Sequence, residues 1–329
     1  MMTTTLFPTS GSQKPGDFVH VSVLPAETIS LLLTDPHGIY VDCTIGGAGH
    51  ASLLLEQMAP EGRLIGIDQD AAAIACAERR LGHDERVTLA QSNFSNITEL
   101  LCQMNIDKVN GFLFDLGVSS PQLDEGARGF SYNHDALLDM RMNQGEGMNA
   151  ADILNSADVK ELAAIFAQYG EERWASRIAQ FVVQRRQHQP IATTEELVEI
   201  VKAAIPAAAR RSGPHPAKRV FQALRIAVNR ELEVLETALD QALTCLAAQG
   251  RLAVITFHSL EEKMLAGKIR TWLGRCTCPP GLPECRCGHV PRIEVVTRKP
   301  VLPSAAEIER NPRSRSAKLR VIARKGEDL

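Results

Sequence analysis

The chain has 329 residues, of which 44% are hydrophobic and 23% charged, and its formal net charge is −3. This composition is typical of a globular protein with one large or two modest domains. No apolar run reaches the roughly 18 residues that a membrane span needs, and the polar N-terminus lacks the basic and apolar regions of a signal peptide. We therefore expect a cytoplasmic protein with a flexible leader at residues 1–18, reduced cysteines and no membrane association.

Strand and helix patterns alternate in the first third of the chain. Short apolar stretches predict strands at 38–42, 63–68, 86–90 and 111–115. Helices are predicted between them, at 24–33, 51–58, 71–81 and 98–104. Strands that alternate with helices of this length form a parallel sheet covered by helices, which is an α/β fold.

The pattern changes after about residue 125. A loop is predicted over 125–144, and helices at 159–169, at 172–187 and from Thr193, which can form a capping box with Glu196. An apolar stripe from 221 to 246 predicts one long helix that ends at Gly250, before a strand at 252–257 and a capping box of Ser259 with Glu262. The sequence therefore predicts an α/β domain at 19–124 and 215–329 that is interrupted by an all-helical domain at 125–214.

Basic residues are concentrated in two segments. Residues 173–225 hold ten Lys or Arg and three Glu, and so do residues 292–325. Such segments can form a surface for a polyanion, although they can equally be solvated helix faces.

A glycine-rich turn follows the first predicted strand, in the stretch VDCTIGGAGH at 41–50. Ligands of parallel α/β sheets bind beyond the carboxyl ends of the strands, where a turn without side chains lets a ligand approach the backbone. Asp68 ends the next strand, at a position suited to both hydroxyls of a ribose. The turn does not match the dinucleotide pattern GxGxxG, and no phosphate-binding loop is present. These features favour S-adenosylmethionine over NAD, with Phe94 able to pack against adenine.

Seven sequence blocks, taken together, resemble those of a known family. The blocks VDCTIGGAGH, GIDQD, DLGVSSPQLD, LDMRM, HPAKRVFQALRIAVNREL, ITFHSLEEK and NPRSRSAKLR closely resemble those of the RsmH (MraW) family. This family comprises bacterial methyltransferases that modify N4 of a cytidine in the RNA of the small ribosomal subunit. The resemblance spans about residues 20–324. It implies a class I (Rossmann-like) fold dependent on S-adenosylmethionine, with an inserted all-helical domain and with 16S rRNA in the small ribosomal subunit as substrate.

The resemblance also implies the site residues. Those implied for the cofactor are Ala48, Gly49 and His50 at its methionine part, Asp68 at the ribose, Phe94 at the adenine, and Asp115 and Gln122 to complete the pocket. An exocyclic amine becomes nucleophilic when hydrogen-bond acceptors surround it, and such acceptors are expected in the loop after the fourth strand. We nominate Asp115 and Ser120 as catalytic, although the loop has one proline and no aromatic residue.

Two further features bear on function. The pairs Cys276–Cys278 and Cys285–Cys287 have one intervening residue each, whereas paired zinc ligands usually have two to four, so we assign no metal. No protein partner is evident. The alternatives are an amino-methyltransferase acting on DNA or another RNA, a non-catalytic RNA-binding assembly factor, and an NAD oxidoreductase, which the broken dinucleotide pattern disfavours.

Overall fold

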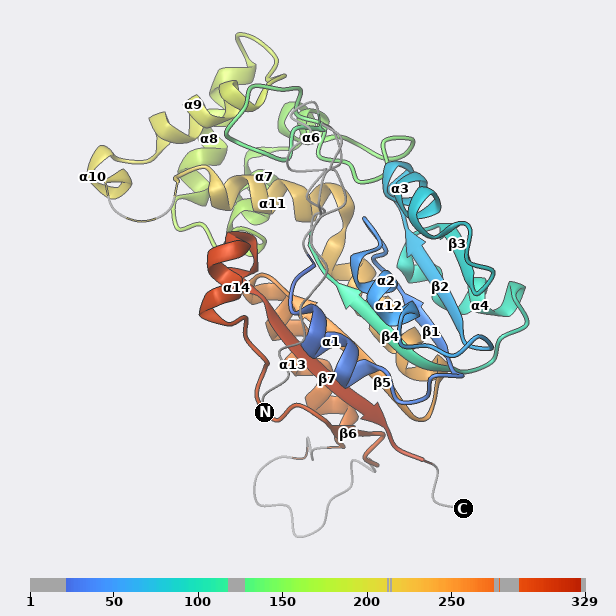
Figure 1. The fold of residues 1–329 in the computed structure, drawn as a ribbon. Helices are drawn as coiled ribbons and strands as arrows, with labels where there is room; N and C mark the ends of the chain where they lie inside the picture. Colours follow the sequence, from blue (N-terminus) through green and yellow to red (C-terminus); the bar gives the residue numbers. More distant parts are fainter. Residues whose placement is uncertain are drawn as a thin grey trace, which may run out of the picture.

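The computed structural model describes residues 22–117, 128–211, 213, 215–274, 278 and 290–326. A seven-stranded sheet with the order β3-β2-β1-β4-β5-β7-β6 forms its centre (Figure 1). Strands β1 to β5 are parallel, and β7 runs antiparallel to both of its neighbours. The bounds are β1 Ile39–Asp42, β2 Arg63–Asp68, β3 Val87–Gln91, β4 Val109–Asp115, β5 Leu246–Thr256, β6 Ile293–Val295 and β7 Lys318–Arg324.

Helices cover both faces of the sheet because successive strand residues point to opposite sides. In β4, Phe112 and Phe114 pack into one core with α4, α12 and α13. Leu113 packs into the other core with α1, α2 and α3. The bounds are α1 Pro25–Leu32, α2 Gly49–Leu55, α3 Ala71–Leu81, α4 Ile97–Gln103, α12 Glu231–Cys245 and α13 Ser259–Trp272. This arrangement is the Rossmann-like α/β fold that the sequence predicts.

A second group of helices lies beyond the carboxyl ends of β1, β2 and β4 (Figure 1). These helices share a core of their own, which extends from Phe130 to Leu224. Their bounds are α6 Ala150–Ser156, α7 Val159–Gln168, α8 Ala175–Arg186, α9 Thr194–Ala204, α10 Ala207–Arg210 and α11 Lys218–Asn229. Helix α11 contributes four buried residues to this core, so the helical core continues past residue 214 into the segment that the sequence analysis assigned to the α/β domain. The exact domain boundaries stay a prediction.

The long helix predicted over 221–246 is wrong, because two helices, α11 and α12, meet at Arg230. That residue has a φ of 49°, in the left-handed region, which no continuous helix contains. One tertiary and one local hydrogen bond hold the break, because the Asn229 side chain donates to the carbonyl oxygen of Met140 and to that of Arg225 in the preceding turn. Periodicity does not detect such a break, since the apolar stripe runs on through it.

Two further predicted helix ends differ from the structure. Helix α12 ends at Cys245 and Gly250 lies within β5. The capping box of α13 is formed by His258 and Glu261, each one position before the predicted residues Ser259 and Glu262. The predicted capping box of Thr193 with Glu196 is confirmed. Within the described part of the chain, no helix has both the length and the apolar character that crossing a membrane requires.

Candidate active site

A cavity lies at the carboxyl ends of the parallel strands, where the sequence analysis placed the ligand. Its walls come from the turn after β1, the ends of β2 and β4, and the residues that follow β3 and β5. The start of α12 and the segment between α14 (Ala305–Arg310) and the 3₁₀ helix η3 (Pro312–Ser316) complete it. Among the predicted site residues, Gly49, His50, Asp68, Phe94 and Asp115 line this cavity.

The glycine turn and Asp68 are linked directly. The backbone N–H of Gly46 donates to Asp68 Oδ2 at 3.0 Å, and that of Asp70 donates to Oδ1 at 2.9 Å. Gly46 has a φ of +46°, which strains most other residues. Burial raises the pKa of Asp68 to about 6, against the lowering effect of these N–H groups. Asp68 therefore both shapes the turn and presents a carboxylate to the cavity.

Asp115 ends β4 beside the same turn. Its backbone N–H donates to Thr44 Oγ1 at 2.7 Å, while its Oδ1 is buried without a hydrogen-bond partner among the described residues. Burial raises the pKa of Asp115 well above its ordinary value, and the negative charges of Asp42 and Glu261 raise it further. An unpaired buried carboxylate oxygen is costly, so its presence at a cavity points to a missing ligand.

His50 also lines this end of the cavity, and Asp42, which ends β1, lies close enough to Asp115 to raise its pKa. His50 Nε2 lies 2.9 Å from the carbonyl oxygen of Val23, which therefore accepts a hydrogen bond from it. The other ring nitrogen, Nδ1, lies 3.6 Å from Asp115 Oδ2. Burial raises the pKa of Asp42 to about 7, although Thr44 donates to its carboxylate. The raised pKa values of Asp42 and Asp115 mean that burial disfavours their charged forms, and a cationic ligand at this end would favour the carboxylates.

The opposite end of the cavity is apolar. The Phe94 ring packs edge-on against Phe114 with centroids 5.6 Å apart. Gln69 holds this end together, because it accepts a hydrogen bond from Asn93 and donates to the sulfur of Met142. An aromatic ring and a methionine side chain can each pack against the flat face of a ring such as adenine.

The loop that carries Met142 is held by two polar residues whose roles the sequence analysis did not assign. Arg128 donates to Asp70 Oδ2 at 3.0 Å and to the carbonyl oxygens of Arg141 and Met142. Asn229 Oδ1 accepts the N–H of Met142 at 2.8 Å. Both residues connect the helical segment to the cavity, and they lie within or beside sequence blocks that the family resemblance rested on.

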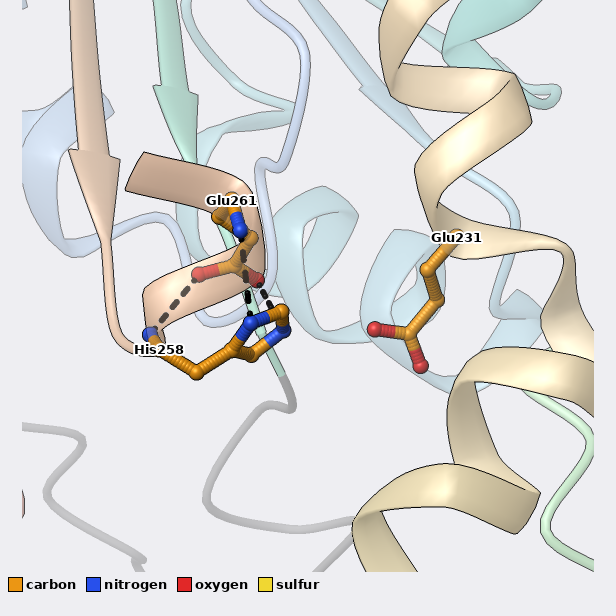
Figure 2. Close-up of side chains that lie close together, drawn as sticks. All are labelled: Glu231, His258 and Glu261. Carbon is orange, nitrogen blue, oxygen red and sulfur yellow. Dashed lines mark hydrogen bonds and ion pairs between the residues drawn. The ribbon is translucent and has the colours of Figure 1, made fainter. Parts of the chain in front are cut away.

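Glu231, His258 and Glu261 meet at the wall between α12 and α13 (Figure 2). One side-chain oxygen or nitrogen atom from each of the three residues lies within 4.8 Å of the other two, a spacing that a metal ion could use. Two observations give them a different role. Arg225 donates two hydrogen bonds of 2.8 Å to the Glu231 carboxylate, and Glu261 Oε2 accepts the N–H groups of Phe257 and His258.

The His258 ring is oriented in the same way. Its Nδ1 accepts the backbone N–H of Glu261 at 3.4 Å, which leaves the proton of the neutral ring on Nε2, 2.9 Å from Glu261 Oε1. Burial acts to raise the pKa of Glu261, but the adjacent His258 and the charge of Arg225 outweigh it and hold the pKa below its ordinary value. We interpret the cluster as a polar support for the cavity wall.

The remaining predicted residues have two different outcomes. Ala48 is fully buried with a φ of 59° and does not line the cavity, so only its backbone is suited to a ligand contact. Ser120 and Gln122 lie outside the described residues, and so do Cys276, Cys285 and Cys287. The roles of all these residues stay predictions.

The basic segments divide into structural and exposed parts. Arg186 donates two hydrogen bonds of 2.7 Å to the carbonyl oxygens of Leu154 and Ala157. Arg320 pairs with Glu262, and Arg324 donates to carbonyl oxygens at the end of α12. In contrast, the side chains of Arg310, Arg313 and Arg315 are exposed, and Arg313 lines the cavity.

Comparison with known proteins identifies the family. The family model described as "MraW methylase family" matches residues 17–325. The chain is 53% identical over 308 residues to a protein of Symbiobacterium thermophilum named ribosomal RNA small subunit methyltransferase H, covering 93% of this chain and 97% of that protein. A protein of Brevibacillus brevis with the same name is 54% identical over 305 residues and covers 92% and 97%. The chain belongs to the MraW methylase family.

A solved rRNA methylase from Streptococcus thermophilus is 11% identical, with a TM-score of 0.40 over 91% of this chain and 92% of that one. As a member of the MraW methylase family, the chain is a methyltransferase that depends on S-adenosylmethionine. The cavity fits this cofactor. It offers a turn without side chains, an acidic residue beside that turn, an apolar slot at Phe94 and an unpaired carboxylate oxygen on Asp115.

Proposed function

We propose that the chain transfers a methyl group from S-adenosylmethionine to the N4 amine of a cytidine in the 16S rRNA of the small ribosomal subunit, in the cytoplasm. The names of the relatives and the sequence blocks support the substrate. The single observation in the molecule that carries the chemistry is Asp115, whose buried Oδ1 lacks a partner among the described residues at the carboxyl end of β4.

The residues that hold the cofactor in this proposal come from four strand ends. The Phe94 ring packs against the adenine, and Asp68 accepts hydrogen bonds from the ribose hydroxyls. The turn that contains Gly49 leaves room for the methionine part, and the buried carboxylates of Asp42 and Asp115 offset its positive charge. When bound, S-adenosylmethionine supplies a methyl group made electrophilic by a sulfonium.

Asp115 is the residue of the chain that assists the methyl transfer in this proposal. The lone pair of the cytosine amine is delocalised into the ring, so an acceptor at the amine favours the geometry in which that lone pair can react. Asp115 Oδ1 can accept such a hydrogen bond. Because burial raises the pKa of Asp115, its carboxylate is also a stronger base for the proton that the amine loses, and His50 Nδ1 at 3.6 Å can share that proton. Ser120, from the loop after β4, is the second acceptor in this proposal.

Transfer of labelled methyl to small subunits, followed by mass spectrometry of the nucleosides, tests the proposed function. We expect N4-methylcytidine; a methyl group on C5 or on a ribose would rule out the amine mechanism. An enzyme for DNA or another RNA would keep the same cavity, so these nucleic acids are assayed in parallel. Ser120→Ala is expected to lower kcat while cofactor affinity is retained, since the lost hydrogen bond matters most in the transition state.

RNA contacts are expected from exposed basic side chains near the cavity and on the helical segment. Arg313 and Arg315 lie on η3 at the cavity, and Arg173 and Arg211 are exposed on the helical segment. Such side chains bind phosphates and position the RNA without reading its sequence. Replacing Arg313 and Arg315 by Gln should reduce the slope of log affinity against log salt by about 0.7–0.9 for each lost contact. Arg270→Gln, exposed at the end of α13, is the matched control.

A further inference from the structure

The groups that line the cavity follow the order of the strands in the sheet. Taken in the order β3-β2-β1-β4-β5, the strands bring to the cavity, at or just after their carboxyl ends, Phe94, Asp68, the glycine turn, Asp115 with Gly117, and Phe257. The proposed function assigns the first three positions, together with Asp115, to the cofactor. The part of the cavity between β4 and β5, which ends at Phe257, is left for the group that accepts the methyl.

Among the described residues that line the cavity, two carry a phenyl ring, Phe94 and Phe257. The Phe94 ring already packs edge-on against Phe114. Phe257 is partly buried, packs on the core that contains α1 to α3, and leaves the rest of its ring at the cavity. The two rings therefore lie at the two ends of the row of strand ends that borders the cavity.

The space beside the Phe257 ring is kept open by glycine. Gly117 has a φ of +107°, and a Cβ atom added there would lie 3.5 Å from Cδ2 of Phe257. Any side chain at residue 117 would therefore extend from a point in contact with the ring. At the end of β4 the chain therefore presents backbone, and no side chain, to the Phe257 ring.

Phe257 is also held in place before any substrate binds. Its backbone N–H donates to Glu261 Oε2 at 2.7 Å, and Glu261 is only 3% exposed. The N–H of His258 donates to the same oxygen at 3.1 Å, and the His258 ring faces the other Glu261 oxygen (Figure 2). Glu261 is thus a positioning residue, which acts on the substrate through the backbone of residue 257.

We propose that Phe257 is the ring on which the target cytosine stacks during methyl transfer, an inference that rests on the proposed function. A base that is modified at an exocyclic atom must leave its own stack, and aromatic side chains replace the lost stacking. The segment from Asp115 to Ala127, which follows β4, contains no aromatic residue. Phe257 at the end of β5 supplies the ring that this segment lacks.

The test compares matched substitutions at the two rings. Phe257→Leu keeps an apolar side chain but removes the stacking surface, and we expect kcat/KM for unmethylated small subunits to fall by about five- to a hundredfold. Its affinity for S-adenosylmethionine, measured by calorimetry, should stay within about twofold of wild type. Phe94→Leu should show the reverse, with weaker cofactor binding as the primary defect. Phe257→Tyr should restore most of the lost kcat/KM, because a phenol stacks as a phenyl ring does.

Each outcome decides between the two proposals. If wild type makes N4-methylcytidine and Phe257→Leu keeps full kcat/KM, the stacking proposal is wrong and the proposed function stands. If Phe257→Leu loses cofactor affinity as much as it loses kcat/KM, the ring serves the cofactor or the fold, and the stacking proposal is again wrong. If wild type transfers no methyl to a cytidine amine, the proposed function fails first and the stacking proposal fails with it.

Discussion

Replacing Asp68 by alanine removes a group that the structure places in two roles. Its carboxylate accepts the N–H groups of Gly46 and Asp70 and also lines the cavity. Loss of the acceptor leaves two backbone N–H groups unpaired, at a cost of about 1–3 kcal/mol each. Alanine also abolishes a buried charge, which acts in the opposite direction.

The size of that opposite effect follows from the pKa. Burial raises the pKa of Asp68 from 3.8 to about 6, and about two pKa units correspond to roughly 3 kcal/mol for a fully buried group. Because Asp68 is half-buried at the cavity, we discount this to about 2 kcal/mol. The raised pKa means that the folded protein holds this proton more tightly than the unfolded chain. Its stabilising contribution is therefore complete below about pH 4 and is lost as the pH rises through 6.

The two effects partly cancel at pH 8 and do so less at pH 5. We expect Asp68→Ala to fold, with a free energy of unfolding about 0–4 kcal/mol below wild type at pH 8 and about 1 kcal/mol further below it at pH 5, where about half of the pH-dependent contribution has returned. Cofactor affinity should fall about ten- to a hundredfold, the value of a hydrogen bond to a charged group.

Urea unfolding at both pH values and calorimetry with S-adenosylmethionine measure these effects separately. Asp68→Asn is the intermediate control, since it keeps one acceptor oxygen and loses the charge. Wild-type cofactor affinity in a folded Asp68→Ala variant would show that this carboxylate does not hold the ribose. A difference in unfolding free energy that does not change between pH 5 and pH 8 would refute the reasoning from burial.

Three further outcomes follow from other contacts. Because burial raises the pKa of Asp115, wild type should bind S-adenosylmethionine more tightly, relative to the demethylated product that lacks the sulfonium charge, as the pH rises through this raised pKa; calorimetry should find this trend abolished in Asp115→Asn. Arg186→Ala should lower the free energy of unfolding by about 1–3 kcal/mol in urea titrations, because two carbonyl oxygens lose their donor. The control Arg185→Ala removes one side of a part-exposed ion pair and should change the free energy of unfolding by less than about 1 kcal/mol. Asn229→Asp should lower the melting temperature by several degrees, since an acceptor then faces the carbonyl oxygen of Met140. An unchanged melting temperature would show that this side chain does not hold the break between α11 and α12.

The parallel part of the sheet could be predicted because its signals are local. Each strand from β1 to β4 is a short apolar run, and β2 has the predicted bounds, Arg63–Asp68. Because parallel strands end at one edge, the sequence positions of the glycine turn, Asp68 and Asp115 were enough to predict that they meet there. The hydrogen bond from Gly46 to Asp68 confirms the pairing of the turn with the acid.

The support of the cavity could not be predicted in the same way. Arg128 and Asn229 act through hydrogen bonds to backbone groups that are distant in sequence or lie across an irregular loop, and such bonds have no periodicity. The left-handed backbone of Arg230 could not be predicted either. The apolar stripe continues without interruption from α11 into α12, although the helix breaks at this residue and Glu231 binds Arg225 across the break. The quoted blocks contain several of these residues, but a block does not say which of its members face the cavity.

The pairing of β4 with β5 explains why Phe257 was missed. The two strands are separated in sequence by the helical segment, yet Asp115 is paired with Ile255 in the sheet. That register places the residues after β5 beside those after β4, so that Phe257 lies next to Gly117. A search for an aromatic residue along the loop after β4 finds none, because the ring enters from the neighbouring strand. The pairing of β4 with β5 therefore lets two strand ends that are distant in sequence form one half of the cavity, while most residues proposed for the cofactor precede residue 116.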